Sequence, residues 1–456
     1  MSHERIISDQ KRLALSAFVC FQNIIAGGLI YGWDGISGTI LTATVENGGA
    51  GLSPSTAMNV FSVASSLACF SQLFLGFLQD RYSPKVCSLI SNTLVGFGCF
   101  VFFSKQIEMY MIYVGAALIG IGGPGVQLSL IHLSNLYPGR ENTALSFMTG
   151  TINLSFLVFP LIANLWRVHQ VSFQVMFHLL GVLILVMVVL SFFFLPDITY
   201  EKVNNPSDGG NKEENNGGSV DDNTATDHLH TLKTCREQLQ TLKFTFLVVF
   251  FTVTSFFANF YIGSISIEVR NVFVFKISLE MIPNSDFVKM GDTKILAGKN
   301  TNNFVQYFAL ISSFSGILFS PLAGYLLDII GDHQTNMITC VLGISQAILL
   351  LLAKSRGLLL TSFLFYSLFR SFLYPCFFSG LAISFGFNHY GLLSGIGVAF
   401  SGAFFLSFAP LASKLVIEKE WTCLYLLQFF SLAMVFFFEL KLFLNVKKEA
   451  KTYILE

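Results

Sequence analysis

One arginine lies deep inside a long apolar stretch of this 456-residue chain. Arg370 falls within an apolar run at about 358–385, where a charge is costly and is usually kept for a function. Its guanidinium offers a planar fork of N–H donors that matches a carboxylate. Two interpretations stay open. Arg370 either binds the carboxylate of a solute or pairs structurally with a glutamine or with backbone carbonyls.

Uncharged polar residues in the other apolar runs could complete a pocket around Arg370. A buried amide or hydroxyl needs a hydrogen-bond partner, so each of them also has a packing interpretation. The candidate substrate-binding residues besides Arg370 are Gln22, Asn23, Gln127, Asn153, Tyr261, Gln306, Tyr307 and Tyr374. Asp34, at the end of the first run, could attract a cation, although a solvated helix end is the favoured interpretation.

The sequence lacks the arrangements that hydrolytic and metal-dependent enzymes need. It contains no Gly-x-Ser-x-Gly elbow, no cluster of metal ligands and no paired carboxylates inside the apolar runs. A glycine-rich string at 120–125 fits a dinucleotide-binding pattern, but it lies in an apolar run and no strand precedes it. We therefore expect no catalytic residue, no metal and no cofactor. Equal numbers of basic and acidic residues, 27 each, give no indication of nucleic acid binding.

Membrane-spanning helices must position these residues. The chain is 53% hydrophobic and only 12% charged, whereas soluble proteins carry about 25% charged residues. Because a helix needs about 20 mostly apolar residues to cross a bilayer, we predict twelve spans in an all-α membrane protein. The predicted spans are 13–33, 56–78, 86–104, 109–133, 143–166, 173–195, 244–265, 304–327, 335–353, 358–385, 391–416 and 422–444.

The spans divide into two six-helix halves. The predicted organisation is an N-terminus at 1–12, a first half at 13–195, a linker at 196–243, a second half at 244–444 and a C-terminus at 445–456. The centre of the linker is polar and free of aromatic residues, which predicts disorder. Its end, 228–243, is either an amphipathic helix on the membrane or an ordinary helical linker.

Lys and Arg residues in the loops predict the orientation. With both termini and the linker in the cytoplasm, 15 of them lie inside and 11 outside. Five of those 11 belong to one long outer loop at about 266–302, and long loops count little. We therefore predict cytoplasmic termini. No address signal is readable, and a plasma-membrane location and a monomeric state are our expectations.

A short string, Gly-x-Leu-x-Asp, closes the second predicted span of each half. Its residues are Gly76, Asp80 and the following Arg81 in the first copy, and Gly324 and Asp328 in the second. A small residue lets two helices touch, and an aspartate can accept backbone N–H groups at a neighbouring helix N-terminus. Arg81 could pair with a carboxylate. We expect these five residues to form a gate on the cytoplasmic side, with Arg81 making the first copy the stronger.

This repeated string resembles the loop motif of the major facilitator superfamily, although Ser83 and Pro84 replace an expected Gly and a basic residue. Shorter strings are similar to solute carrier family 43, the system-L transporters of large neutral amino acids. They lie at 26–33, 132–138, 259–263, 370–374 and 389–395. The high Phe content and the Asn-rich linker also resemble apicomplexan amino acid transporters related to that family.

The resemblance implies alternating-access transport of free amino acids without obligate ion coupling. The predicted boundaries place no Asp, Glu or Lys in the middle of a span, which also favours a facilitator over a proton-coupled symporter. Two alternatives stay open. The cargo could be a nucleobase or another small organic solute, or the chain could be a receptor-like membrane protein without transport activity.

Overall fold

A computed structural model describes residues 9–45, 48–102, 109–137, 140–196, 234–280, 289–353, 355–386 and 389–455. These residues form helices joined by short turns, with no β-strand among them. Eleven helices are long and apolar enough to cross a membrane, and one bent pair, Gln10–Gly27 with Leu29–Leu41, makes the twelfth span. The predicted all-α fold with twelve spans in two halves is therefore confirmed.

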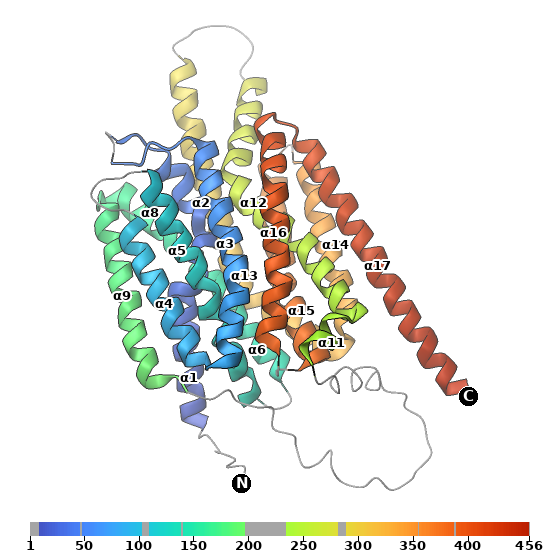
Figure 1. Cartoon of the computed structure of the whole chain (residues 1–456). Helices are drawn as coiled ribbons and strands as arrows, with labels where there is room; N and C mark the ends of the chain where they lie inside the picture. Colours follow the sequence, from blue (N-terminus) through green and yellow to red (C-terminus); the bar gives the residue numbers. More distant parts are fainter. Residues whose placement is uncertain are drawn as a thin grey trace.

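The first half runs from α1 to α9 and occupies one side of the bundle (Figure 1). Its elements are α1 (Asp9–Gln22), a π-helical turn (Asn23–Gly27), a 3-10 turn (Leu29–Gly32), α2 (Trp33–Ile36), a second π-helical turn (Ser37–Leu41), α3 (Pro54–Arg81), α4 (Pro84–Phe102), α5 (Met109–Leu128), a 3-10 turn (Ile131–Leu136), α6 (Glu141–Gly150), α7 (Ile152–Ser155), α8 (Val158–His169) and α9 (Phe173–Phe194).

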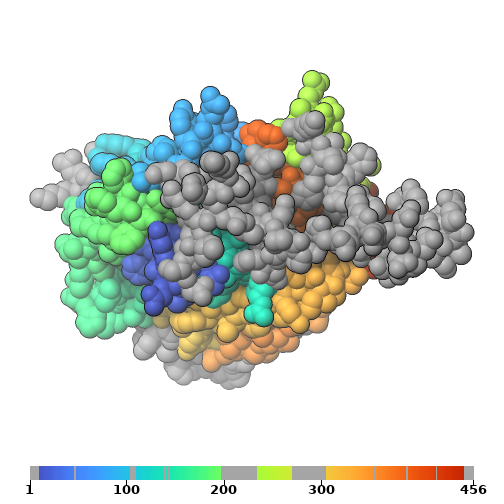
Figure 2. Space-filling view, turned by 90° about the horizontal axis from the view of Figure 1, so that it is seen from below, coloured from blue at the N-terminus to red at the C-terminus, as the bar shows by residue number. Residues whose placement is uncertain are grey.

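The second half packs beside the first. It consists of α11 (Cys235–Leu239), α12 (Leu242–Glu280), α13 (Lys289–Ile330), α14 (Asp332–Leu351), α15 (Arg356–Phe385), α16 (Tyr390–Ile417) and α17 (Trp421–Leu455). The start of α1 and the end of α17 both lie at the lower end of the bundle in Figure 1, and we call this side the terminal face. Figure 2 shows it with the teal start of α6 against orange α13, so both halves contribute to it.

Three helices continue beyond the predicted limits. The supposed outer loop at 266–302 is largely helical, because α12 extends to Glu280 and α13 begins at Lys289. Helix α17 extends past the predicted end at 444 to Leu455. Of the predicted amphipathic segment 228–243, residues 228–233 lie outside the described residues, and the rest begins with the short helix α11.

The first span is broken where two glycines follow each other. Its two parts meet at an angle of 54°, and Gly28 between them has a non-helical backbone, with φ −132° and ψ 21°. A Cβ atom on Gly28 would lie 3.0 Å from the carbonyl oxygen of Ile152, and one on Gly123 would lie 2.7 Å from that of Gly27. Close packing against α5 and α7 and a bend therefore occur together at this point.

A polar network joins three helices of the second half near the terminal face. Lys243 pairs with Asp332 at 3.0 Å. Glu439 accepts from Asn336 Nδ2 at 3.0 Å and lies 2.7 Å from His333 Nδ1. Glu439 is buried inside the last predicted span. It lies five residues before the end of that span rather than in its middle, and Asp34 and Glu268, which lie just outside the predicted spans 13–33 and 244–265, are buried as well.

We predict that Glu439→Leu lowers the apparent melting temperature of the purified protein by a few degrees. The change leaves His333 and Asn336 without their acceptor, which costs about 1–3 kcal/mol for each buried unsatisfied group. The control is Glu418→Gln, which removes an exposed pair with Lys414 worth at most about 1 kcal/mol. Equal melting temperatures for the two variants would show that the network does not stabilise the fold.

Candidate functional site

Arg370 on α15 lies between the two halves and contacts both. Its side chain is buried, and its Nη1 donates to Asn259 Oδ1 at 3.1 Å. The guanidinium lies 4.9 Å from the centre of the Tyr31 ring and 5.0 Å from that of Phe156, both in the first half. The ring of Tyr374 on its own helix lies at 5.1 Å. Arg370 is thus a charge enclosed by aromatic faces, which stabilise a cation when water is excluded.

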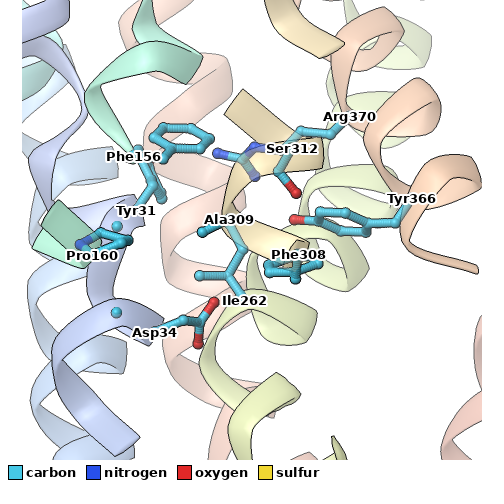
Figure 3. A pocket seen from close by; sticks show the side chains of 12 residues that line it. Tyr31, Asp34, Phe156, Pro160, Ile262, Phe308, Ala309, Ser312, Tyr366 and Arg370 are labelled. Atoms are coloured by element: carbon cyan, nitrogen blue, oxygen red, sulfur yellow. The ribbon is translucent and has the colours of Figure 1, made fainter. Parts of the chain in front are cut away.

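Two small cavities adjoin this arginine. One has a volume of about 30 Å³ and is lined from both halves by residues that include Cys69, Gln72, Gln127, Asn259, Tyr374 and Ser401. The other, of about 10 Å³, is lined by residues that include Tyr31, Asp34, Phe156, Phe308, Tyr366 and Arg370 (Figure 3). A buried water needs at least about 10–15 Å³, so these spaces hold a few waters at most. A solute can enter only when the halves separate.

Arg370, Gln127 and Tyr374 are the sequence candidates that the structure brings together, since all three line the 30 Å³ cavity. Gln22 and Asn23 do not line either cavity. Gln22 donates to Ser88 and Ser191 at 2.8 and 3.0 Å, and Asn23 donates to Thr151 at 3.0 Å. These bonds join helices within the first half, which is the packing interpretation of buried amides.

The remaining candidates do not line the two cavities either. Asn153 packs against α13, where a Cβ atom on Gly316 would lie 2.0 Å from its Nδ2. Tyr261 is buried beside the rings of Phe308 and Tyr366. Gln306 is half-buried on α13, and the neighbouring Tyr307 is 48% exposed on the outside of the bundle.

Several cavity residues were not among the candidates. Tyr31 and Asn259 stand inside the strings that resemble solute carrier family 43, and Gln72 is a polar residue in the middle of the second predicted span. Those two signals could have identified them. Asp34 was placed at the outer end of the first span. The structure instead buries it, because the broken first span continues to Leu41.

Asp80 caps the N-terminus of α16 from the opposite half. Its Oδ1 accepts the backbone N–H of Gly391 at 3.2 Å, and its Oδ2 accepts that of Leu392 at 2.9 Å. The residue at the N-cap position of α16, His389, makes no capping hydrogen bond with its side chain. Asp80 therefore satisfies backbone donors that α16 cannot satisfy by itself, and its charge complements the helix dipole.

Gly76 makes this cap possible by letting α3 and α16 touch. A Cβ atom on Gly76 would lie 2.1 Å from the carbonyl oxygen of Gly391, and one on Gly395 would lie 2.6 Å from the Cα of Leu73. No larger residue fits at either position without moving a backbone. The first copy of the repeated string therefore holds α3 against α16 at the terminal face.

The second copy occupies the corresponding place between α13 and α6. Asp328 Oδ2 accepts from the Thr143 hydroxyl, in the first turn of α6, at 3.1 Å. Arg140, the N-cap residue of α6, makes no capping hydrogen bond with its side chain. Further along, a Cβ atom on Gly150 would lie 2.6 Å from the carbonyl oxygen of Gly316. Each half thus extends an aspartate to a helix start in the other half.

Arg81 is exposed, and no ion pair or hydrogen bond joins it to the described residues. The expectation that Arg81 pairs with a carboxylate and strengthens the first copy has no support in this part of the chain. The two backbone bonds of Asp80 account for the strength of that contact instead.

Comparison with known proteins identifies the family to which this architecture belongs. The family model of the Major Facilitator Superfamily matches residues 23–283, which is more than half of the chain. This protein belongs to the major facilitator superfamily. The repeated string and the twelve spans in two halves are thereby explained as features of a superfamily transporter.

Solved structures share the fold across nearly the whole chain. A mutant of the peptide transporter POT has a TM-score of 0.60 and 15% identity, with 93% of each chain covered. A POT family transporter in complex with 5-aminolevulinic acid has a TM-score of 0.60 and 13% identity, covering 94% of this chain and 96% of that one. The human organic anion transporter MFSD10 (TETRAN) has a TM-score of 0.58 and 14% identity, covering 93% of this chain and 100% of that one.

Two sequence relatives match shorter segments. Protein FMP42 of Saccharomyces cerevisiae is 25% identical over 171 residues, which cover 34% of each chain. The Large neutral amino acids transporter small subunit 3 of Homo sapiens is 24% identical over 130 residues, covering 28% of this chain and 23% of that one. The matches therefore span about a third or less of these relatives.

We predict that Asp80→Ala opens the terminal face more often. Losing a helix cap costs about 0.5–2 kcal/mol, which raises the open population about two- to thirty-fold. The native Cys69 lines the 30 Å³ cavity and reports this opening. Its labelling by a membrane-impermeant maleimide, applied at the terminal face and located by mass spectrometry, should accelerate in that range.

The matched control is Arg81→Ala, which changes the neighbouring charge but removes no described contact. Labelling of Cys69 should stay within two-fold of wild type in this variant. If Asp80→Ala labels as slowly as wild type while Arg81→Ala labels faster, the backbone cap is not what closes this face.

Proposed function

We propose that this superfamily transporter carries free amino acids across the membrane by alternating access. The observation that carries the proposal is Arg370, a buried guanidinium at the cavities between the halves. A cation in this position suits a substrate with a carboxylate, because bidentate charge-assisted hydrogen bonds are strong in a dry site. The match to a human transporter of large neutral amino acids and the strings that resemble solute carrier family 43 support the same substrate class.

The contacts at the terminal face suggest how the carrier cycles. Asp80 and Asp328 each bond to a helix start in the other half, so the two halves are joined there. On the opposite side of the centre, a cavity of about 80 Å³ is lined by residues of both halves, among them Trp33, Met58, Gly263 and Ser266. Rocking one half against the other would break the aspartate contacts and close this second space.

The coupling to ions depends on the charges that line the cavities. The sequence favours an ion-independent facilitator because the predicted span boundaries place no carboxylate in the pathway. Asp34 lines the 10 Å³ cavity together with Arg370, so the pathway does contain one. We propose a facilitator because the opposite charges of Asp34 and Arg370 cancel each other. A zwitterion also carries no net charge, so its binding requires no accompanying ion. Cytoplasmic termini, a plasma-membrane location and a monomeric state remain predictions.

The test is uptake by purified protein in liposomes. Labelled neutral, cationic and aromatic amino acids and a nucleobase are supplied with and without a pH gradient. We expect saturable amino acid uptake that needs no gradient. Uptake of the nucleobase alone would replace the substrate class, a strict requirement for the gradient would replace the facilitator, and binding without flux would favour the receptor-like alternative.

We predict that Arg370→Lys lowers amino acid uptake at least ten-fold. Lysine keeps the charge but loses the planar fork of donors that faces Asn259 and the aromatic rings. The matched control is Arg356→Lys at the exposed start of the same helix, which should transport like wild type. Normal amino acid uptake by Arg370→Lys would show that the planar fork of donors does not bind the substrate carboxylate.

A further inference from the structure

Asp34 is a buried carboxylate without a counter-charge. Its side chain is 4% exposed, and its Oδ1 has no hydrogen-bond partner among the described residues. No ion pair within the described part of the chain includes it. Burying a charged or polar group without a partner is costly. Packing therefore does not account for a carboxylate at this position.

The cavity that Asp34 lines also contains Arg370. Figure 3 shows the carboxylate at one end and the guanidinium at the other, with Ala309 and Ile262 between them. Tyr31, whose ring contacts Arg370, precedes Asp34 by three residues, which is roughly 5 Å along the helix. The two opposite charges thus face one cavity but do not pair with each other.

Arg370 is held back from Asp34 by its surroundings. Nη1 donates to Asn259, and the rings of Tyr31 and Phe156 lie within 5.0 Å of the guanidinium. Its Nε remains without a hydrogen-bond partner in the described structure. Both groups therefore have hydrogen-bonding atoms without partners in the same enclosed space. A dipolar ligand would supply a partner for each of them.

We infer that Asp34 binds the α-ammonium group of the amino acid whose carboxylate is bound by Arg370. The inference rests on the proposed function and defines its site as a two-ended clamp for a zwitterion. The ammonium supplies the donors and the charge that Asp34 lacks, and the carboxylate supplies the acceptors for Arg370. Each α-amino acid carries this pair of groups whatever its side chain, so the clamp selects the class rather than one member.

The experiment compares amino acids with analogues that lack the α-amine. Unlabelled competitors displace a labelled amino acid from purified wild type, Asp34→Asn and Asp34→Glu. The pairs are leucine with 4-methylpentanoate, phenylalanine with 3-phenylpropanoate and lysine with 6-aminohexanoate. The last pair separates the α-ammonium from a side-chain ammonium, because 6-aminohexanoate keeps only the latter.

For wild type we expect each analogue to bind at least ten-fold more weakly than its amino acid, since it lacks the charge-assisted hydrogen bonds from the α-ammonium to Asp34. Asp34→Asn should weaken the amino acids by a similar factor and leave the analogues within two-fold, which removes the discrimination. Asp34→Glu should retain part of it. The matched control is Glu268→Gln. Glu268 is equally buried but accepts from the Tyr425 hydroxyl and does not line this cavity.

Three results would overturn the inference. Equal competition by analogues and amino acids in wild type would do so even if Asp34→Asn fails to fold. Full discrimination between amino acids and analogues by Asp34→Asn would also overturn it, as would competition by 6-aminohexanoate as strong as that by lysine. In each case, amino acid uptake by wild type would still support the proposed function. Failure of the proposed function is recognised differently, because wild type then neither binds nor transports any amino acid of the panel.

Discussion

The closed arrangement depends on two aspartates that contact helix starts across the boundary between the halves: Asp80 caps α16, and Asp328 accepts from the Thr143 hydroxyl in the first turn of α6. The first turns of α16 and α6 follow His389 and Arg140, whose side chains make no capping hydrogen bond. Asp80 and Asp328 reach these turns from the opposite half. A cap contributes about 0.5–2 kcal/mol, and water can replace it when the halves part. This one cap and the single Asp328–Thr143 side-chain hydrogen bond bias the equilibrium toward closure without making it irreversible, as a carrier requires.

The Asp80 cap also connects the terminal face to the central cavity. Gly76 and Gly391 let the backbones of α3 and α16 touch beside Asp80. About one and two turns from Gly76 along α3, Gln72 and Cys69 line the 30 Å³ cavity, and Ser401 lines it from α16. Any movement that separates the capped ends must therefore change the shape of that cavity. The repeated string, which marks the family but not the cargo, thus acts through the helices on the cavity that we propose as the substrate site.

The sequence predicts the spans well because each run must be long and apolar to cross lipid. It underestimates helices that continue past the apolar run, since α12 between Ser266 and Glu280 interrupts its apolar residues with charged and polar ones. The position of a polar residue within a predicted span indicates how far along the helix it lies, but not which side of the helix its side chain faces. Arg370 and Gln127 face a cavity, whereas Gln22 bonds within its own half and Tyr307 faces outward. The break after Gly27, which leaves Asp34 inside the bundle, depends on packing against α5 and α7.

The separation of Asp34 from Arg370 has a consequence for the cycle itself. If the two side chains could meet, they would form a buried ion pair and occupy the space of a ligand. Asn259 and the rings hold the guanidinium in other contacts, so neither group has an ion-pair partner among the described residues. Closing without a substrate then leaves Asp34 dehydrated with no counter-charge, and Arg370 with one hydrogen bond and aromatic contacts only. The proposed zwitterion would supply the missing partner at both ends, and its differential affinity for the closed state would then favour closure of the loaded carrier over the empty one.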